Sequence, residues 1–177
     1  MSLGAERPGV DHVVVMGVSG CGKSTVAAGL ARALGGTFVD GDDLHPQANI
    51  DKMSAGTPLT DADRWPWLDR VGETLGEAGG PLPRIIACSA LKRAYRDRIV
   101  ARAGVPVAFV HLHGSDAVLS DRMTKREGHF MPTDLLRSQL ATLEMPGPDE
   151  RAETIDIDRP IEDLVAAAVA ALRDLAG

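Results

Sequence analysis

The stretch GVSGCGKST at residues 17–25 decides the fold of this chain. It contains the pattern G-x-x-x-x-G-K-[ST], follows the β-branched run HVVVMG (12–17) and leads into the helical pattern KSTVAAGLARALGG (23–36). In a strand, glycine-rich turn and helix of this kind, backbone N–H groups converge on phosphate oxygens, and the helix adds the positive end of its dipole. The stretch therefore predicts a nucleotide phosphate site.

Each residue of this phosphate loop has an expected part in binding. Lys23 should reach the β- and γ-phosphates, and the Ser24 hydroxyl should ligate Mg²⁺. Cys21 is expected to be a small loop residue, because phosphoryl transfer needs no thiol nucleophile. The predicted nucleotide-binding residues of the loop are Gly17, Ser19, Gly20, Cys21, Gly22, Lys23, Ser24 and Thr25.

Composition predicts one globular domain. The chain has 177 residues, of which 44% are hydrophobic and 25% charged, and its net charge of -6 argues against non-specific nucleic-acid binding. Its two cysteines are too few for a disulfide framework and suggest a reducing compartment, so a cytoplasmic location is expected. No apolar run approaches the length of a membrane span, and residues 1–10 are expected to be a disordered lead-in.

The hydrophobic pattern predicts an α/β fold. Further strands are expected at 37–40, 84–90, 107–114 and 154–158, with helical segments between them. Thr60 should cap one of these helices, whose buried stripe would be Trp67, Leu68, Val71 and Leu75. Alternating strands and helices imply a parallel five-stranded sheet covered on both faces, which is a three-layer architecture.

Residues outside the loop indicate a small-molecule kinase rather than a switch or a motor. A guanine-reading Asn-Lys-x-Asp cannot occur, since the only asparagine, Asn49, is followed by Ile50. RIIACSA (84–90) lacks the terminal acidic pair of motor-type ATPases. The acidic cluster Asp40-Gly41-Asp42-Asp43 instead follows the second strand, and a kinase needs a carboxylate beside the acceptor hydroxyl. The alternative for this cluster is a solvated acidic turn.

Two segments offer an acceptor site. The first, residues 40–68, lies between the second and third strands and includes His45, which could touch substrate or form only local hydrogen bonds. The second, ACSALKRAYRDR (87–98), places Lys92 and Arg96 four residues apart, so that they would share a helix face and could clamp a carboxylate.

A third segment, RMTKREGHFMP (122–132), is expected to be a lid. Arg122 and Arg126, four residues apart, lead into a stretch containing Gly128, which could bring cations onto the transferring phosphoryl group and exclude water. For His129, as for His45, substrate contact and a local hydrogen bond both stay open.

These segments resemble the gluconokinases of the small thermoresistant type, within the shikimate-kinase-like group of P-loop kinases. The resemblance runs from Val13 to the last helix. Its marks are GVSGCGKST, GDDLHPQANIDKMSAGTPLTDADRWPWL, ACSALKRAYRD and REGHFMPTDLLRSQLATLE. It implies ATP-dependent phosphorylation of D-gluconate at its 6-hydroxyl, a sheet ordered 2-3-1-4-5 and a homodimer.

The resemblance also implies residue roles. Asp40 would support the Mg²⁺ water shell, Asp42 would meet the acceptor hydroxyl, Arg122 would flank adenine and Arg126 would close over the phosphates. Arg64, Lys92 and Arg96 are the candidates for the gluconate carboxylate and hydroxyls. Which of these or Arg93 holds the carboxylate stays open.

Three rival functions share part of this pattern. Shikimate kinase has the same loop and strand-two acid but normally shows a glycine triplet after the third strand, where this chain has Cys88-Ser89-Ala90. A nucleoside-monophosphate kinase fits less well. A non-catalytic nucleotide-binding module predicts that the lid arginines or the strand-two carboxylate are missing, and both are present.

Overall fold

The computed structural model describes residues 9–124 and 133–176. Its five strands form one parallel sheet in the order β2-β3-β1-β4-β5, which confirms the predicted order. Each strand is short, and β1 lies at the centre. The strands are β1 (His12–Met16), β2 (Thr37–Asp40), β3 (Arg84–Ala87), β4 (Ala108–His113) and β5 (Ala152–Asp156).

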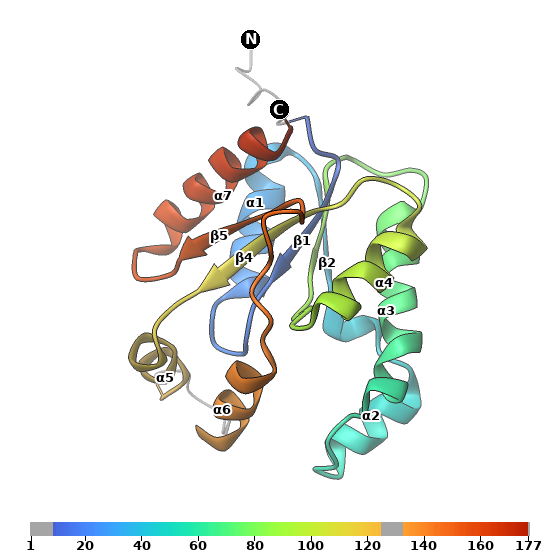
Figure 1. Cartoon of the computed structure of the whole chain (residues 1–177). Helices are drawn as coiled ribbons and strands as arrows, with labels where there is room; N and C mark the ends of the chain where they lie inside the picture. Colours follow the sequence, from blue (N-terminus) through green and yellow to red (C-terminus); the bar gives the residue numbers. More distant parts are fainter. Residues whose placement is uncertain (1–8, 125–132, 177) are drawn as a thin grey trace.

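Helices cover both faces of the sheet, so the predicted three-layer α/β architecture is confirmed. Figure 1 shows α1 and α7 on one face, α3 and α4 on the other, and α2, α5 and α6 near the carboxyl ends of the strands. In the described ranges, no helix is long and apolar enough to cross a bilayer. The helices are α1 (Lys23–Leu34), α2 (Gln47–Ser54), α3 (Asp61–Gly76), α4 (Arg93–Ala103), α5 (Asp116–Thr124), α6 (Thr133–Thr142) and α7 (Ile161–Ala176), with a 3₁₀ helix, η1, at Gly41–Leu44.

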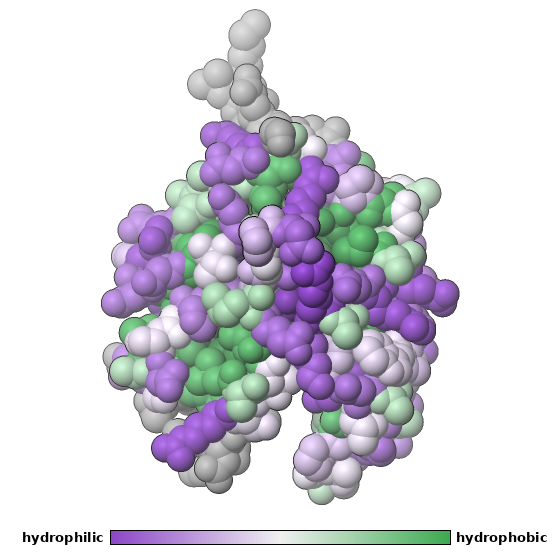
Figure 2. Space-filling model, in the orientation of Figure 1, coloured by the Kyte–Doolittle hydropathy of each residue, from purple (hydrophilic) through white to green (hydrophobic). Residues whose placement is uncertain are grey.

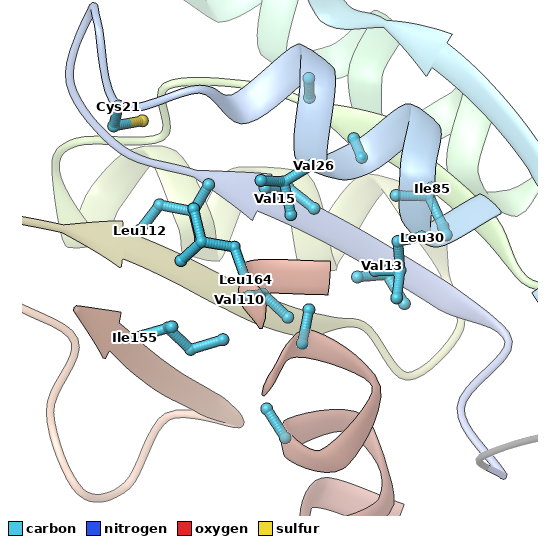
Figure 3. Close-up of a cluster of buried hydrophobic side chains, with 14 of the residues drawn as sticks. Val13, Val15, Cys21, Val26, Leu30, Ile85, Val110, Leu112, Ile155 and Leu164 are labelled. Atoms are coloured by element: carbon cyan, nitrogen blue, oxygen red, sulfur yellow. The ribbon is translucent and has the colours of Figure 1, made fainter. Parts of the chain in front are cut away.

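The two faces of the sheet carry two hydrophobic clusters. Val13 and Val15 of β1 pack with residues of α1 and α7, as Figure 3 shows for Leu30 and Leu164. The alternate residues of β1 join a second cluster against α3 and α4, because successive side chains of a strand point to opposite faces. The predicted stripe of α3 is confirmed as part of this second cluster: Trp67, Leu68, Val71 and Leu75 are all buried.

Most predicted boundaries hold to within two or three residues, and the start of α3 is confirmed in detail. The Thr60 hydroxyl accepts from the Asp63 N–H at 3.2 Å, while the Asp63 carboxylate accepts from the Thr60 N–H at 2.9 Å. The third strand ends earlier than predicted, at Ala87. Ala90 has φ 45°, a left-handed backbone conformation that cannot continue a strand.

His111 is the buried imidazole of the central sheet. It is fully buried on β4, and its Nδ1 atom lies 3.3 Å from the Thr154 hydroxyl on β5. Burial is the main reason that the pKa of His111 falls to about 4, and the charges of His113 and Arg96 contribute to this shift. The folded protein therefore holds this imidazole neutral at pH 7.

This pKa predicts acid destabilisation. The folded-state pKa is depressed below the usual 6.5, so the unfolded chain binds the proton more readily and stability falls as pH drops from about 6.5 towards 4. The loss attributable to His111 should reach up to about 3 kcal/mol below both pKa values. Urea unfolding of wild type and His111→Gln across pH 7 to 4.5 checks this. The wild-type free energy of unfolding should fall more steeply, and parallel curves would contradict the prediction.

Candidate active site

The phosphate loop has the backbone geometry that its glycines predict. Gly17 has φ 149°, and a Cβ atom there would lie 2.6 Å from the Leu112 carbonyl oxygen and 2.7 Å from Cys21 Sγ. Cys21 is fully buried in the core beneath the loop, as expected for a small loop residue (Figure 3). Only glycine fits at residue 17, and the chain can therefore turn sharply from β1 into the loop.

Helix α1 presents its amino end to the loop. Its N-cap is Gly22, which has no side chain to cap the first turn, so the N–H groups of Lys23, Ser24 and Thr25 lie where an α-helix has no internal acceptors. The Lys23 ammonium donates to the Val18 carbonyl at 3.3 Å and thus lies over the loop. An anion is the group that such an arrangement binds best.

The acid at the end of β2 contacts this loop. Ser24 Oγ donates to Asp40 Oδ2 at 3.4 Å, and Asp40 Oδ1 accepts from the Asp42 N–H at 3.0 Å. This approach requires Gly41, since a Cβ atom there would lie 2.3 Å from the Ala87 carbonyl oxygen. The hydroxyl and carboxylate predicted to serve Mg²⁺ are thus brought together, and both are hard oxygen donors of the kind that Mg²⁺ prefers.

Lys23 and Asp42 both lie near Cys88 at the carboxyl end of β3. Burial raises the pKa of the Cys88 thiol to about 12, and the charges of Lys23 and Asp42 act on it in opposite directions. The side chains of Asp42 and Asp43 are exposed. The structure therefore brings the predicted acceptor carboxylate and the loop lysine to the same end of the sheet.

Trp67 holds the segment after β2 in place. Its Nε1–H donates to the Gly41 carbonyl at 2.8 Å. The same indole stacks on the His45 ring, with centroids 4.2 Å apart and planes 13° apart, and His45 is 8% exposed. A buried residue of α3 thus fixes both the acidic turn and His45.

The tautomer of His45 follows from its neighbours. Asn49 Nδ2 lies 2.9 Å from the Asp63 carbonyl oxygen, which can only accept, and 3.1 Å from His45 Nδ1. The amide nitrogen is therefore the donor to both, and the His45 proton resides on Nε2. Burial lowers the pKa of His45, so the ring is a neutral N–H donor at pH 7.

Helices α2 and α3 are tied by an ion pair. The Lys52 ammonium donates to both carboxylate oxygens of Asp63, at 2.8 and 3.0 Å. The hydrogen bond from Lys52 is the main reason that the pKa of Asp63 falls to about 2. One carboxylate therefore caps α3 and anchors α2.

Two predicted substrate cations gather around one acid at the start of α3 and α4. Lys92 Nζ lies 3.3 Å and Arg64 Nη1 3.7 Å from the Asp61 carboxylate, which also accepts from the Tyr95 hydroxyl. Arg64 Nη1 lies 3.4 Å from that hydroxyl. With two cations and one anion, this Asp61 cluster keeps an excess of positive charge, and both cations are about one third exposed at 31% and 33%.

Arg96 does not join this cluster, and the sequence prediction for it needs correction. Lys92 is the extended N-cap of α4, so helical spacing does not place the two residues on one face. Arg96 is 1% exposed and pairs with Glu150 at 2.6 Å. All five of its N–H groups donate inside the protein, to Glu150 and to the carbonyls of Ala90, Leu91 and Glu144. The structure gives Arg96 a structural role.

Arg122 lies beside the phosphate loop. Its guanidinium donates to the carbonyls of Ile157 and Arg159, in the segment after β5, and approaches Gly22. Arg126, His129 and most of the lid predicted at 122–132 lie outside the described residues. In the space-filling view, a notch separates the part of the surface at α6 from the part at α2, at the edge where the strands end (Figure 2).

Known proteins with similar sequences identify the family of this chain. A family model described as an AAA domain matches residues 13–146. A gluconokinase of Gluconobacter oxydans is 56% identical over 141 residues, 78% of each chain, and the thermoresistant gluconokinase of Escherichia coli is 44% identical over 92% of this chain and 95% of its own. The chain belongs to the gluconokinase family. A solved gluconokinase of Sinorhizobium meliloti superposes with a TM-score of 0.86 at 50% identity, covering 97% of this chain and 95% of its own.

Several residues of this gluconokinase-family site carry no sequence signal of their own. Asp61 and Tyr95 complete the cation cluster, and Asn49 sets the His45 tautomer. Gln139 of α6 contacts Ser19 of the phosphate loop. Asn49 and Gln139 lie within the marks of the resemblance, but neither has a charge or spacing that points to its partner.

The corrected role of Arg96 predicts a loss of stability rather than of substrate affinity. Arg96→Met leaves the buried Glu150 carboxylate unpaired and should lower the free energy of unfolding by about 3–5 kcal/mol. Arg98 lies on the same helix as Arg96 and pairs at the surface with Asp69 of α3, so Arg98→Met is the matched control and should change the free energy of unfolding little. Urea unfolding and KM for gluconate are the measurements. If Arg96→Met left the free energy of unfolding unchanged and raised KM for gluconate, Arg96 would be a substrate-binding residue after all.

Proposed function

We propose that this chain transfers the γ-phosphoryl group of ATP to the 6-hydroxyl of D-gluconate, giving 6-phosphogluconate and ADP. The observation that carries the proposal is the contact between Ser24 of the phosphate loop and Asp40 at the end of β2, in a chain of the gluconokinase family. This contact puts the nucleotide end of the site and the acidic turn within reach of one another. A phosphoryl transferase needs that proximity between donor and acceptor.

The transfer itself is a substitution at phosphorus. The 6-hydroxyl oxygen bonds to the γ-phosphorus while the bond to the bridging β–γ oxygen breaks, and the hydroxyl proton passes to the Asp42 carboxylate. Lys23, held over the loop, offsets negative charge on the phosphates as the bridging oxygen leaves with ADP. Asp42 is exposed, and its charge lies near Cys88 as that of Lys23 does, so Asp42 is the proposed acid for the substrate hydroxyl.

Mg²⁺ is part of the proposal. Ser24 Oγ and Asp40 would hold it, directly or through water, and their 3.4 Å separation suits two oxygen donors that face one ion. When bound, the ion offsets charge on the phosphate oxygens.

The Asp61 cluster and His45 are the proposed gluconate contacts. Arg64 and Lys92 share a single carboxylate partner, which leaves positive charge for the carboxylate of the substrate. The neutral His45 Nε2–H is a donor suited to a sugar hydroxyl, because it carries no charge that would favour a second anion. Arg122, beside Gly22 and the segment after β5, is the proposed contact for the adenine end of ATP.

A coupled assay of ADP release tests the function. Gluconate should support turnover with ATP and Mg²⁺, whereas shikimate and nucleoside monophosphates should not. Lys23→Ala should remain folded and lose about 10²–10³ in rate, because a preorganised charge at the phosphates is removed. Turnover with shikimate in place of gluconate would favour the rival kinase, and nucleotide binding without any turnover would favour a binding module.

The roles within the acidic turn are separately testable. Asp42→Asn keeps the side-chain shape but loses the base, so kcat at saturating gluconate should drop by roughly 10²–10⁴ while ATP affinity by calorimetry is retained. Asp43→Asn, an equally exposed neighbour on η1, is the matched control and should be much milder. The assignment of Asp42 as the base would be overturned if Asp43→Asn showed the large loss of kcat. It would also be overturned if Asp42→Asn changed only the affinity for ATP.

We further propose a cytoplasmic homodimer. The family resemblance supports the dimer, and light scattering on the purified chain tests it. Cys21 and Cys88 are buried and form no disulfide, which is in keeping with a reducing compartment.

A further inference from the structure

Two hydrogen bonds join α6 to the phosphate loop across 120 residues of sequence. The Ser19 N–H donates to Gln139 Oε1 at 2.7 Å, and Gln139 Nε2 donates to Ser19 Oγ at 3.0 Å. A backbone N–H can only donate, so it fixes which end of the carboxamide faces it, and the other end then meets the hydroxyl. The Gln139 carboxamide is thus bound to Ser19 by two hydrogen bonds, which fix both its orientation and its distance from the phosphate loop.

Ser19 lies at the part of the loop that positions Lys23. The adjacent Val18 carbonyl accepts both the Lys23 ammonium and the Cys21 N–H, each at 3.3 Å. Gly20, on the other side of Ser19, has φ 85°. A change in the position of Ser19 therefore moves the carbonyl on which the lysine rests.

Helix α6 is anchored well enough to hold the loop. Leu136, one turn before Gln139, is 2% exposed within the core cluster of α1 and α7, and Leu140 packs against that cluster. Beyond the helix, the Glu144 N–H donates to the Leu91 carbonyl at 2.8 Å, in the segment between β3 and α4. Gln139 therefore projects from an element that is fixed on both sides of the loop contact.

From this geometry we propose that Gln139 is a positioning residue for the nucleotide: it holds Ser19 so that the phosphate loop stays in its ATP-binding conformation. It acts through the loop and touches neither substrate. Losing two neutral hydrogen bonds should weaken ATP binding about tenfold. The inference deepens the proposed function and rests on it for the kinetic readout, whereas nucleotide affinity can be measured without turnover.

Substitutions at the two ends of the contact test the proposal. Gln139→Ala and Gln139→Met should each raise the Kd for a non-hydrolysable ATP analogue about tenfold in calorimetry, with KM for ATP rising in parallel and KM for gluconate within about twofold of wild type. Methionine keeps the length and packing of glutamine, so a methionine variant with wild-type ATP affinity would overturn the proposal. Ser138→Ala, an exposed neighbour on α6, is the matched control and should bind as wild type does.

A double-mutant cycle separates this contact from general disturbance of α6. Ser19→Ala removes one of the two bonds and should weaken ATP binding by about threefold, and Ser19→Ala with Gln139→Ala should be no weaker than Gln139→Ala alone. If the two substitutions raised the Kd for the ATP analogue by factors that simply multiply in the double variant, the proposal would be contradicted. Variants that lose thermal stability but keep the wild-type Kd would contradict it as well. If wild type binds the ATP analogue but does not turn over gluconate, the proposed function fails while the Kd comparison still decides the role of Gln139.

Discussion

The hydrogen bond from the Gly17 N–H to the Ser89 carbonyl, at 3.3 Å, joins the two halves of this site. It links the phosphate loop after β1 to the segment after β3, which leads into the acceptor-side cations of α4. That segment includes Ala90 in a left-handed conformation, which costs energy for a residue with a Cβ atom and persists only when its surroundings enforce it. Arg96 provides the enforcement, since its guanidinium donates to the Ala90 and Leu91 carbonyls and its charge is balanced by Glu150. A buried ion pair thus shapes the site without entering it.

The acceptor side is organised by hydrogen bonds among its own residues. Trp67 fixes Gly41 and His45, Asn49 fixes the His45 tautomer, and Asp63 accepts from Lys52 while it caps α3. Most of these groups have no free donor or acceptor left for a substrate. The long sequence mark from Gly41 to Leu68 is therefore largely a scaffold, and the side chains of Asp42 and Asp43 in its acidic turn are exposed. Preorganisation of this kind lowers the entropic cost of orienting two substrates.

The sequence was sufficient to predict the fold. Hydrophobic periodicity and the glycine pattern predicted every strand and the sheet layers, because these depend on local spacing and on strand direction. The prediction for Arg96 was wrong because helical spacing cannot tell that Lys92 precedes the helix, or that Glu150, 54 residues away, draws the guanidinium inward. Gln139 was missed for the same reason: its partner lies 120 residues away, and an uncharged amide gives no pattern. Long-range pairing of polar groups is decided by packing, which periodicity does not encode.

The charge distribution explains how a chain of net charge -6 can serve two anionic substrates. On the outer surface of α4, arginines are matched one to one or better by acids, in the pairs Arg93–Asp149, Arg98–Asp69 and Arg102–Glu73. Around Asp61 the balance is reversed, because two cations, Arg64 and Lys92, share this one carboxylate. Carboxylates elsewhere therefore neutralise the cations that would otherwise attract anions to the wrong surface. The field that a sugar acid meets beside Asp61 is set by this local excess, and the overall charge of the molecule says little about it.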